Sequence, residues 1–76
     1  MKELIICMTR ALVDNPEDVN VKEVNGGQTS IYELRVARED IGKVIGKEGK
    51  NAKAMRTIVN AAISKQHKRA FLEIID

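Results

Sequence analysis

The sequence predicts a small α+β domain in which a helix, two strands, two helices and a last strand follow one another. Three segments carry apolar residues at the spacing of a helix. Two short segments with apolar residues at strand spacing flank the glycine-rich turn at residues 25–28, and a last apolar run ends the chain. At 76 residues the chain has the size of one domain, and folding hides only about 60% of the surface of so short a chain. We therefore expect residues 1–76 to form a single domain that uses every apolar face.

The first helix is expected from Lys2 to about Val13. Its apolar residues follow the pattern of a helix with one buried stripe: Leu4, Ile5, Met8, Ala11 and Leu12. Cys7 lies among them and is the only cysteine, so we expect a buried or half-buried side chain that forms no internal disulfide. The helix should end before Pro16, because proline disfavours the α conformation in Asn15.

A β-hairpin is expected next. Val19, Val21 and Val24 predict a strand whose alternation slips once, at a bulge or at the strand's end. The turn signal is residues 25–28, Asn-Gly-Gly-Gln. After this turn, apolar residues alternate with others as in a strand with one buried face: Tyr32, Leu34 and Val36.

Two helices and a strand complete the pattern. We interpret Glu39 and Asp40 as helix capping, since negative charge is favoured where a helix begins. The short helix that follows ends at Gly46, and a longer helix runs from beyond Gly49 to about Lys65. Its expected apolar stripe is Ala52, Met55, Ile58, Val59, Ala62 and Ile63. Residues 70–75 form an apolar run, interrupted only by Glu73, that predicts a strand able to enter the middle of a sheet.

The turn between the two helices is the most informative motif, and it reads Ile45-Gly46-Lys47-Glu48-Gly49-Lys50. Two glycines three apart let the backbone turn sharply and let another chain's backbone come close. The following helix points free N–H groups at the turn, which favours an anion such as a nucleic-acid phosphate. The alternative interpretation is a plain turn, because this glycine spacing often arises by chance.

The charge distribution favours the anion interpretation. Residues 43–56 carry five basic side chains and one acidic one, a net charge of +4, while the whole chain carries only +2. Such segregation suits the footprint of a polyanion. A solvated helix surface is the alternative, and it would be preferred without the glycine turn.

Enzyme motifs mostly fail, so we expect no enzyme, no cofactor and no metal site. Residues 42–48 only faintly resemble a phosphate-binding P-loop, because three residues instead of four separate the glycines and Glu48 replaces the Ser or Thr. His67 is the only histidine and has no nucleophile or metal partner nearby in the sequence. No stretch approaches the roughly 20 apolar residues of a membrane span, and the first residues do not resemble a secretory signal. We therefore expect a cytoplasmic protein that binds no membrane.

Aromatic residues are scarce, since only Tyr32 and Phe71 occur. Small RNA-binding modules such as RRM and OB folds hold bases largely by stacking on aromatic rings. This chain cannot do so repeatedly. We expect instead a groove that receives bases by aliphatic contact, with one wall formed by Ile41, Val44 and Ile45 and the other by apolar strand residues.

The stretch Gly42-Lys43-Val44-Ile45-Gly46-Lys47-Glu48-Gly49-Lys50, with a long helix after it, resembles the core of a KH domain. The element order, helix-strand-strand-helix-helix-strand, resembles the prokaryotic type II form, and the small size resembles its stand-alone bacterial members. This resemblance implies a three-stranded mixed sheet packed on three helices, and binding of single-stranded RNA without strong sequence demands. It also implies a homodimer, or a heterodimer with a larger multidomain KH protein, and a role in RNA chaperoning or post-transcriptional regulation.

Carried onto this chain, the resemblance implies that Gly46 and Gly49 set the loop and that Lys47 contacts phosphate. All the residues implied in RNA binding are Ile41, Lys43, Val44, Ile45, Gly46, Lys47, Glu48, Gly49, Lys50 and Lys53. Glu48 departs from what an anion-binding loop favours. Two alternatives remain: a KH-shaped scaffold with little RNA affinity, and a KH domain broken off a larger factor, which the initiating Met1 disfavours.

Overall fold

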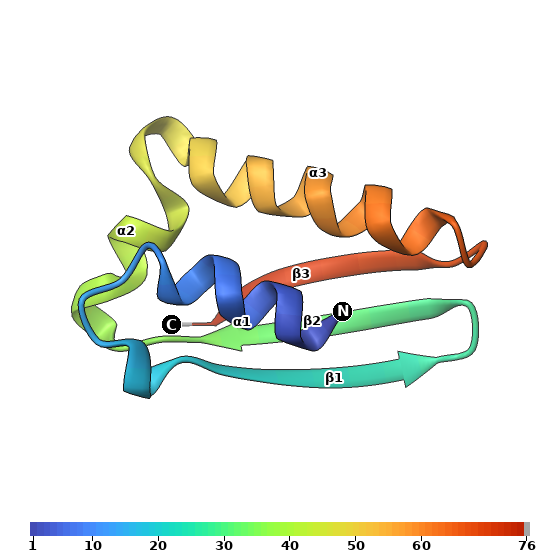
Figure 1. Ribbon diagram of the computed structural model, residues 1–76, viewed down its shortest axis with the longest axis horizontal. Coiled ribbons are helices and arrows are strands. Elements are labelled where there is room, and N and C mark those ends of the chain that lie inside the picture. The colour runs from blue at the N-terminus through green and yellow to red at the C-terminus, as the bar shows by residue number, and fades with distance from the viewer. Residues whose placement is uncertain (76) are drawn as a thin grey trace.

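The computed structural model of the protein describes residues 1–75 and confirms the expected order of helices and strands. The α-helices and strands are α1 (Lys2–Arg10), β1 (Asn20–Gly26), β2 (Thr29–Arg35), α2 (Ile41–Ile45), α3 (Lys50–Ser64) and β3 (Arg69–Ile75). Single turns of 3-10 helix, η1 (Pro16–Asp18), η2 (Arg38–Asp40) and η3 (Lys47–Gly49), lie in the connections. In Figure 1 the β1–β2 turn lies at one end of the molecule, and α2 with the α2–α3 connection lies at the other.

The sheet has the order β1-β2-β3 and is mixed, because β1 pairs antiparallel to β2 while β3 pairs parallel to it. This confirms the α+β fold of the type II KH kind. The expectation that the last strand could enter the middle of the sheet is wrong, since β2 is central and β3 is an edge strand. An apolar run fits either place, and here the side chain of Phe71 remains 51% exposed.

The hairpin is regular along its length. Asn20 to Gly26 pair one by one with Arg35 to Thr29, so there is no bulge. Val24 breaks the apolar alternation because it lies on the outer face, where it is largely exposed. Strand β2 ends at Arg35, one residue before Val36.

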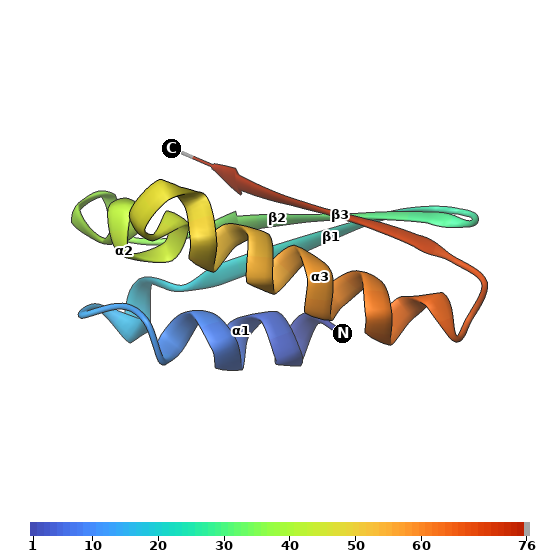
Figure 2. The ribbon, with the colours of Figure 1, turned by 90° about the horizontal axis from the view of Figure 1, so that it is seen from above.

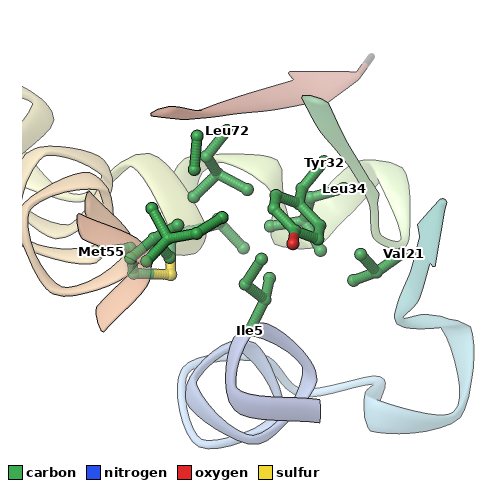
Figure 3. Close-up of a cluster of buried hydrophobic side chains, with 10 residues drawn as sticks. Ile5, Val21, Tyr32, Leu34, Met55 and Leu72 are labelled. Carbon is green, nitrogen blue, oxygen red and sulfur yellow. The ribbon is translucent and has the colours of Figure 1, made fainter. Parts of the chain in front are cut away.

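Helices α1 and α3 lie on the same side of the sheet, and the core lies between them and the strands (Figure 2). Figure 3 shows Ile5 of α1 and Met55 of α3 pointing toward Tyr32, Leu34 and Leu72 of the sheet. The inner face is in register across the strands: Leu34 lies opposite Val21, and Tyr32 lies opposite Leu72.

Helix α1 is shorter than expected, and of its two buried residues Ile5 was expected and Thr9 was not. It ends at Arg10, and a tighter turn follows in which the Leu12 N–H donates to the Thr9 carbonyl. Thr9 is fully buried, and its Oγ1 donates to the Ile5 carbonyl at 2.8 Å, so the buried hydroxyl has a hydrogen-bond partner. Cys7 is exposed, so the expectation of a buried or half-buried thiol is wrong.

Helix α3 follows the predicted range to within one residue. Its buried residues are Ala52, Met55, Val59 and Ile63. Ile58, expected on this stripe, is 45% exposed, because Val59 takes the inward position after Met55. Both apolar residues fit helical spacing from Met55, and packing against the sheet selects Val59.

Candidate nucleic-acid interface

The N-terminal end of helix α2 is held in place by a buried carboxylate, that of Asp40. Asp40 is completely buried, and it accepts hydrogen bonds from the Asp14 N–H at 3.2 Å and the Asn15 N–H at 2.9 Å. The Asn15 side-chain amide donates a third bond to Asp40 at 3.0 Å. Asp40 lies where α2 begins, as expected, but its hydrogen bonds fasten the α1–β1 connection and none caps the helix.

The charge of Lys43 is used inside the same cluster. Its Nζ lies 2.9 Å from Asp14 Oδ2 and 3.7 Å from Asp40 Oδ1. Burial opposes ionisation of Asp40, but the hydrogen bonds from Asn15 and Asp14 and the charge of Lys43 outweigh it and lower the pKa of this carboxyl. The hydrogen bond to Asp14 and its negative charge raise the pKa of Lys43. We name Asp14, Asn15, Asp40 and Lys43 the Asp40 cluster.

The second end of α2 leads into residues 46–49, the GXXG loop. Gly46 has φ 77° and ψ 170°, a region open essentially to glycine alone, and Gly49 has the left-handed φ of 75°. Glu48 is also left-handed, with φ 59° and ψ 24°, and its side chain is exposed. The sequence motif therefore corresponds to a backbone that both glycines are needed to build.

The side chain of Asn51 packs against the loop and supports it. Its Nδ2 donates to the Lys43 carbonyl at 2.9 Å and so ties the start of α3 to α2. A Cβ added to Gly46 would come within 2.7 Å of the Asn51 side chain, whereas one added to Gly49 would meet no atom within 4 Å. Gly46 is thus required by space as well as by torsion, while the Gly49 backbone stays open to close approach.

A groove of about 380 Å³ lies beside the loop. Its lining, which defines the loop groove, is Ile45, Glu48, Gly49, Ala52, Lys53, Arg56 and Ile74. Ile45 from α2 and Ile74 from β3 supply aliphatic walls, Ala52 is buried, and Lys53 lies on the rim. Helices α2 and α3 and the edge strand β3 therefore position the groove together.

The structure separates the residues that the sequence grouped. Lys47 and Lys50 are exposed beside the groove, and Ile45 is 38% exposed within it. Val44 is fully buried in the core and Ile41 is half-buried, and neither lines the loop groove. Of the three residues expected to form the aliphatic wall, only Ile45 does so.

Three residues of this region were not among the expected RNA-binding residues: Asn51, Arg56 and Ile74. The sequence did place Arg56 on the basic face of the long helix near the glycine turn. Arg56 lies three positions after Lys53, so helical spacing alone places both on the same flank of α3. Its Nε donates to the Leu72 carbonyl at 3.2 Å, which holds the guanidinium against β3. Ile74 has the same strand parity as buried Leu72, which indicates the face that it shares. The contact between Asn51 and Gly46 leaves no such signal.

In residues 1–75, no helix is long and apolar enough to cross a membrane. Over the same range, no three or more His, Cys, Asp or Glu side chains are grouped so that they could hold a metal ion.

Comparison with known proteins agrees with this geometry. The family model described as the KhpA/KhpB KH domain matches residues 2–74. The RNA-binding protein KhpA of Clostridium perfringens is 55% identical over 75 residues, which cover 99% of this chain and 100% of that protein. KhpA of Chlamydia pneumoniae is 50% identical over 76 residues, which cover 100% of this chain and 97% of that protein. No solved structure matches. The fold, the GXXG loop and these relatives show that the chain belongs to the KhpA/KhpB family of KH domains.

Proposed function

We propose that this protein binds single-stranded RNA, with the GXXG loop holding phosphates and the loop groove receiving bases. The observation that carries this proposal is one end of the fold where an open glycine turn, exposed lysines and an aliphatic groove meet. The similar proteins of C. perfringens and C. pneumoniae are named RNA-binding proteins, which supports the same ligand class here.

Phosphates are held by close approach and by positive charge. No atom lies near the place where a Cβ of Gly49 would be, so a phosphate oxygen can come close to the backbone there. Lys47 and Lys50 are exposed at the loop, and Lys53 extends the basic rim along α3. Lys43 contributes less, because its ammonium is already paired with Asp14 and Asp40.

Bases are received by aliphatic contact. Ile45 and Ile74 line the loop groove and offer apolar surface for unstacked bases. Paired bases of a duplex cannot enter such a groove, so single strands are preferred. Phosphate contacts carry no sequence information, which fits binding without strong sequence demands.

The protein acts as a binding module without catalysis. His67 follows the end of α3 and Cys7 lies on α1, and both side chains are exposed on separate elements. This placement favours solvated residues over a catalytic pair. Glu48 is exposed, so its carboxylate can lie in solvent while the rest of the loop holds an anion.

The proposed setting is the cytoplasm, in RNA chaperoning or post-transcriptional regulation, as a homodimer or as a heterodimer with a KhpB-like multidomain KH protein. A family model shared by KhpA and KhpB supports such pairing. Large apolar side chains that are exposed outside the loop groove support it as well: Leu4, Val24, Ile58 and Phe71. Light scattering on the purified chain, whose mass is 8.5 kDa, distinguishes a monomer from a dimer.

The binding proposal is tested by fluorescence anisotropy at near-physiological salt, with a single-stranded RNA and its duplex. Lys47→Asp should weaken single-strand binding at least about tenfold, since reversal removes a phosphate contact and adds repulsion. Lys2→Asp is the matched control, because it changes the same charge at the exposed start of α1, where an acid suits the helix dipole. Circular dichroism checks that both variants fold.

Two outcomes would contradict the proposal. One is a folded Lys47→Asp variant with the affinity of the parent. The other is weak binding by the parent that is equal for single strand and duplex, which would favour a KH-shaped scaffold.

A further inference from the structure

A small pocket lies away from the GXXG loop, towards the β1–β2 turn. Its volume is about 200 Å³, and its lining includes Glu23, Ser30, Tyr32, Ile63, Gln66 and Lys68. Met1, at the start of α1, also borders it. Figure 1 shows the end of α3 and the start of β3 at the same end of the molecule as the β1–β2 turn, with α2 at the other. We name this hollow the polar pocket.

The central strand forms the floor of the polar pocket. Ser30 and Tyr32 lie two positions apart on β2, so both belong to the face that the helices cover. Ser30 is 1% exposed, and its Oγ has no hydrogen-bond partner within residues 1–75. Burial and the charge of Glu23 raise the pKa of Tyr32, and Ser30 is near enough to oppose this rise, but outside hydrogen-bond geometry. A buried hydroxyl that lines a hollow and lacks a partner favours a polar ligand there.

The two charged side chains of the pocket come from opposite sides of this floor. Glu23 on β1 is the register partner of Tyr32. Lys68 directly precedes β3, whose Ala70 is the register partner of Ser30. Because β2 is the central strand, the acid and the base approach the pocket from its two sides. One carboxylate and one ammonium thus flank the hydroxyl of Ser30.

Both charges keep bonding capacity for a ligand. Within residues 1–75, neither Lys68 nor Glu23 forms an ion pair. The Glu23 carboxylate accepts one hydrogen bond, from Tyr32 Oη at 3.3 Å. The raised pKa of Tyr32 keeps this phenol protonated, so it remains the donor of that bond. The Met1 α-ammonium lies 3.9 Å from Glu3 Oε2, an acid outside the pocket.

The size and the charge balance of the pocket select the class of ligand. One water needs only about 10–15 Å³ of such space, whereas drug-sized ligands occupy pockets of about 300–1,000 Å³. A hollow of about 200 Å³ with one charge of each sign therefore suits a small zwitterion and disfavours a polyanion. Ile63 is buried and gives the pocket an apolar wall for a short side chain.

We propose that the polar pocket binds a free α-amino acid. The ammonium of the ligand donates to the Glu23 carboxylate, and its carboxylate accepts from Lys68 and from the Ser30 hydroxyl. This site is separate from the loop groove, so the inference does not depend on RNA binding.

The test follows the backbone amide resonances of the full chain by NMR during titration with L-alanine, L-serine and L-valine at millimolar concentrations. Saturable shifts should appear at Ser30 and Lys68 and be absent at Gly46 and Gly49. The N-acetyl derivative of the tightest ligand lacks the ammonium, and its amide lacks the carboxylate. Each derivative should bind the parent chain at least about tenfold more weakly, because it loses a charge-assisted bond.

Variants locate the ligand within the pocket. Lys68→Gln and Glu23→Gln should each weaken binding at least about tenfold. Their matched controls, Lys65→Gln and Glu17→Gln, remove the same charges at exposed positions outside the pocket and should stay within about twofold. Ser30→Ala should also weaken binding, but the thermal midpoint of the free chain should stay the same or rise, because a buried hydroxyl without a partner is removed.

Several results would overturn the inference. One is the absence of saturable shifts with all three amino acids, and another is equal binding of the amino acid and its two derivatives. A third is equal behaviour of the pocket variants and their controls. A crystal grown with the amino acid that shows only a water at Ser30 Oγ would overturn it as well. The comparison of derivatives uses the parent chain, so it holds even if a variant fails to fold.

Discussion

At the N-terminal end of α2, three hydrogen-bond donors converge on the buried Asp40 carboxylate, and the Lys43 ammonium lies 2.9 Å from Asp14. At the other end, Lys47 is exposed on a left-handed loop beside an open groove. Only four positions separate these two lysines, yet one is paired within the protein and the other is available to a ligand. The Asp40 cluster holds the helix in place, and the GXXG loop presents charge.

A run of basic residues must therefore be divided by structure before it is assigned to a ligand. Lys43 and Lys47 look alike in the sequence, and both were expected to contact RNA. The deciding fact is an acid 29 positions upstream, Asp14, which contacts Lys43. The two regions are nevertheless connected, because the Lys43 carbonyl accepts the Asn51 bond that supports the loop.

The largest effect on stability is expected from Gly46→Ala. The variant must hold Ala in a region open essentially to glycine, which costs about 1–3 kcal/mol, and its Cβ would collide with Asn51. Urea unfolding should show a loss at or above the top of this range. A Gly46→Ala variant as stable as the parent would contradict this prediction, because it would show that the loop adapts to the added Cβ without cost.

Gly49→Ala is the control for torsion alone. Its left-handed φ costs about 1–2 kcal/mol, and no atom meets the added Cβ. Gly46→Ala should therefore be the less stable of the two. Combining Gly46→Ala with Asn51→Ala should recover part of the loss, and failure to do so would show that the clash is not its cause.

Asp40→Asn should lower the urea midpoint of unfolding at neutral pH, because an amide cannot replace a carboxylate that accepts three bonds. The folded pKa of Asp40 is lowered, so the stability it contributes is complete above the unfolded value of about 3.9 and is lost as the pH falls through the folded value. The difference between variant and parent should thus shrink below about pH 4.

The neighbouring Glu39→Gln removes an exposed carboxylate and should leave the midpoint unchanged. RNA affinity of folded Asp40→Asn should remain near that of the parent. A pH-independent difference, or an equal effect of Glu39→Gln, would contradict the role given to the Asp40 cluster.

The smallest effect is expected from Glu48. Glu48→Gly removes a left-handed non-glycine residue, and after glycine's own entropic cost the net gain in stability should be about 0.5 kcal/mol. It also removes a negative charge from the loop itself, so RNA affinity should rise about twofold. Glu48→Gln separates the two terms, because it should raise affinity without raising stability. Equal gains in stability from both variants would rule out the torsional cause.

Local patterns were enough to predict most of the fold. The hairpin, the end of α2 at Gly46 and the extent of α3 follow from turn residues and helical spacing. The burial of Val59 was predicted, but the exposure of Ile58 could not be, because both fit the helix and only contact with the sheet decides between them. The edge position of β3 is decided by pairing with β2, which a single apolar run does not specify.

For the site, the sequence predicted the loop but not its supports. Gly46, Gly49 and the exposed lysines are adjacent in the chain, so the motif itself identifies them. The partners of Asp40 lie 25 and 26 positions away, and Ile74 reaches the loop groove from the last strand. Such contacts exist only after the chain has folded.

The most direct test of the difference between the two ends of α2 is a pair of matched variants, Lys43→Gln and Lys47→Gln. Each removes one positive charge, and single-strand RNA affinity is measured for both at the same salt concentration. Loss of the phosphate contact should weaken Lys47→Gln by about tenfold, or about 1.4 kcal/mol, while Lys43→Gln should stay within about twofold of the parent. Equal weakening by the two variants, or a larger effect of Lys43→Gln, would contradict the account in which the Asp40 cluster positions α2 and the GXXG loop binds RNA.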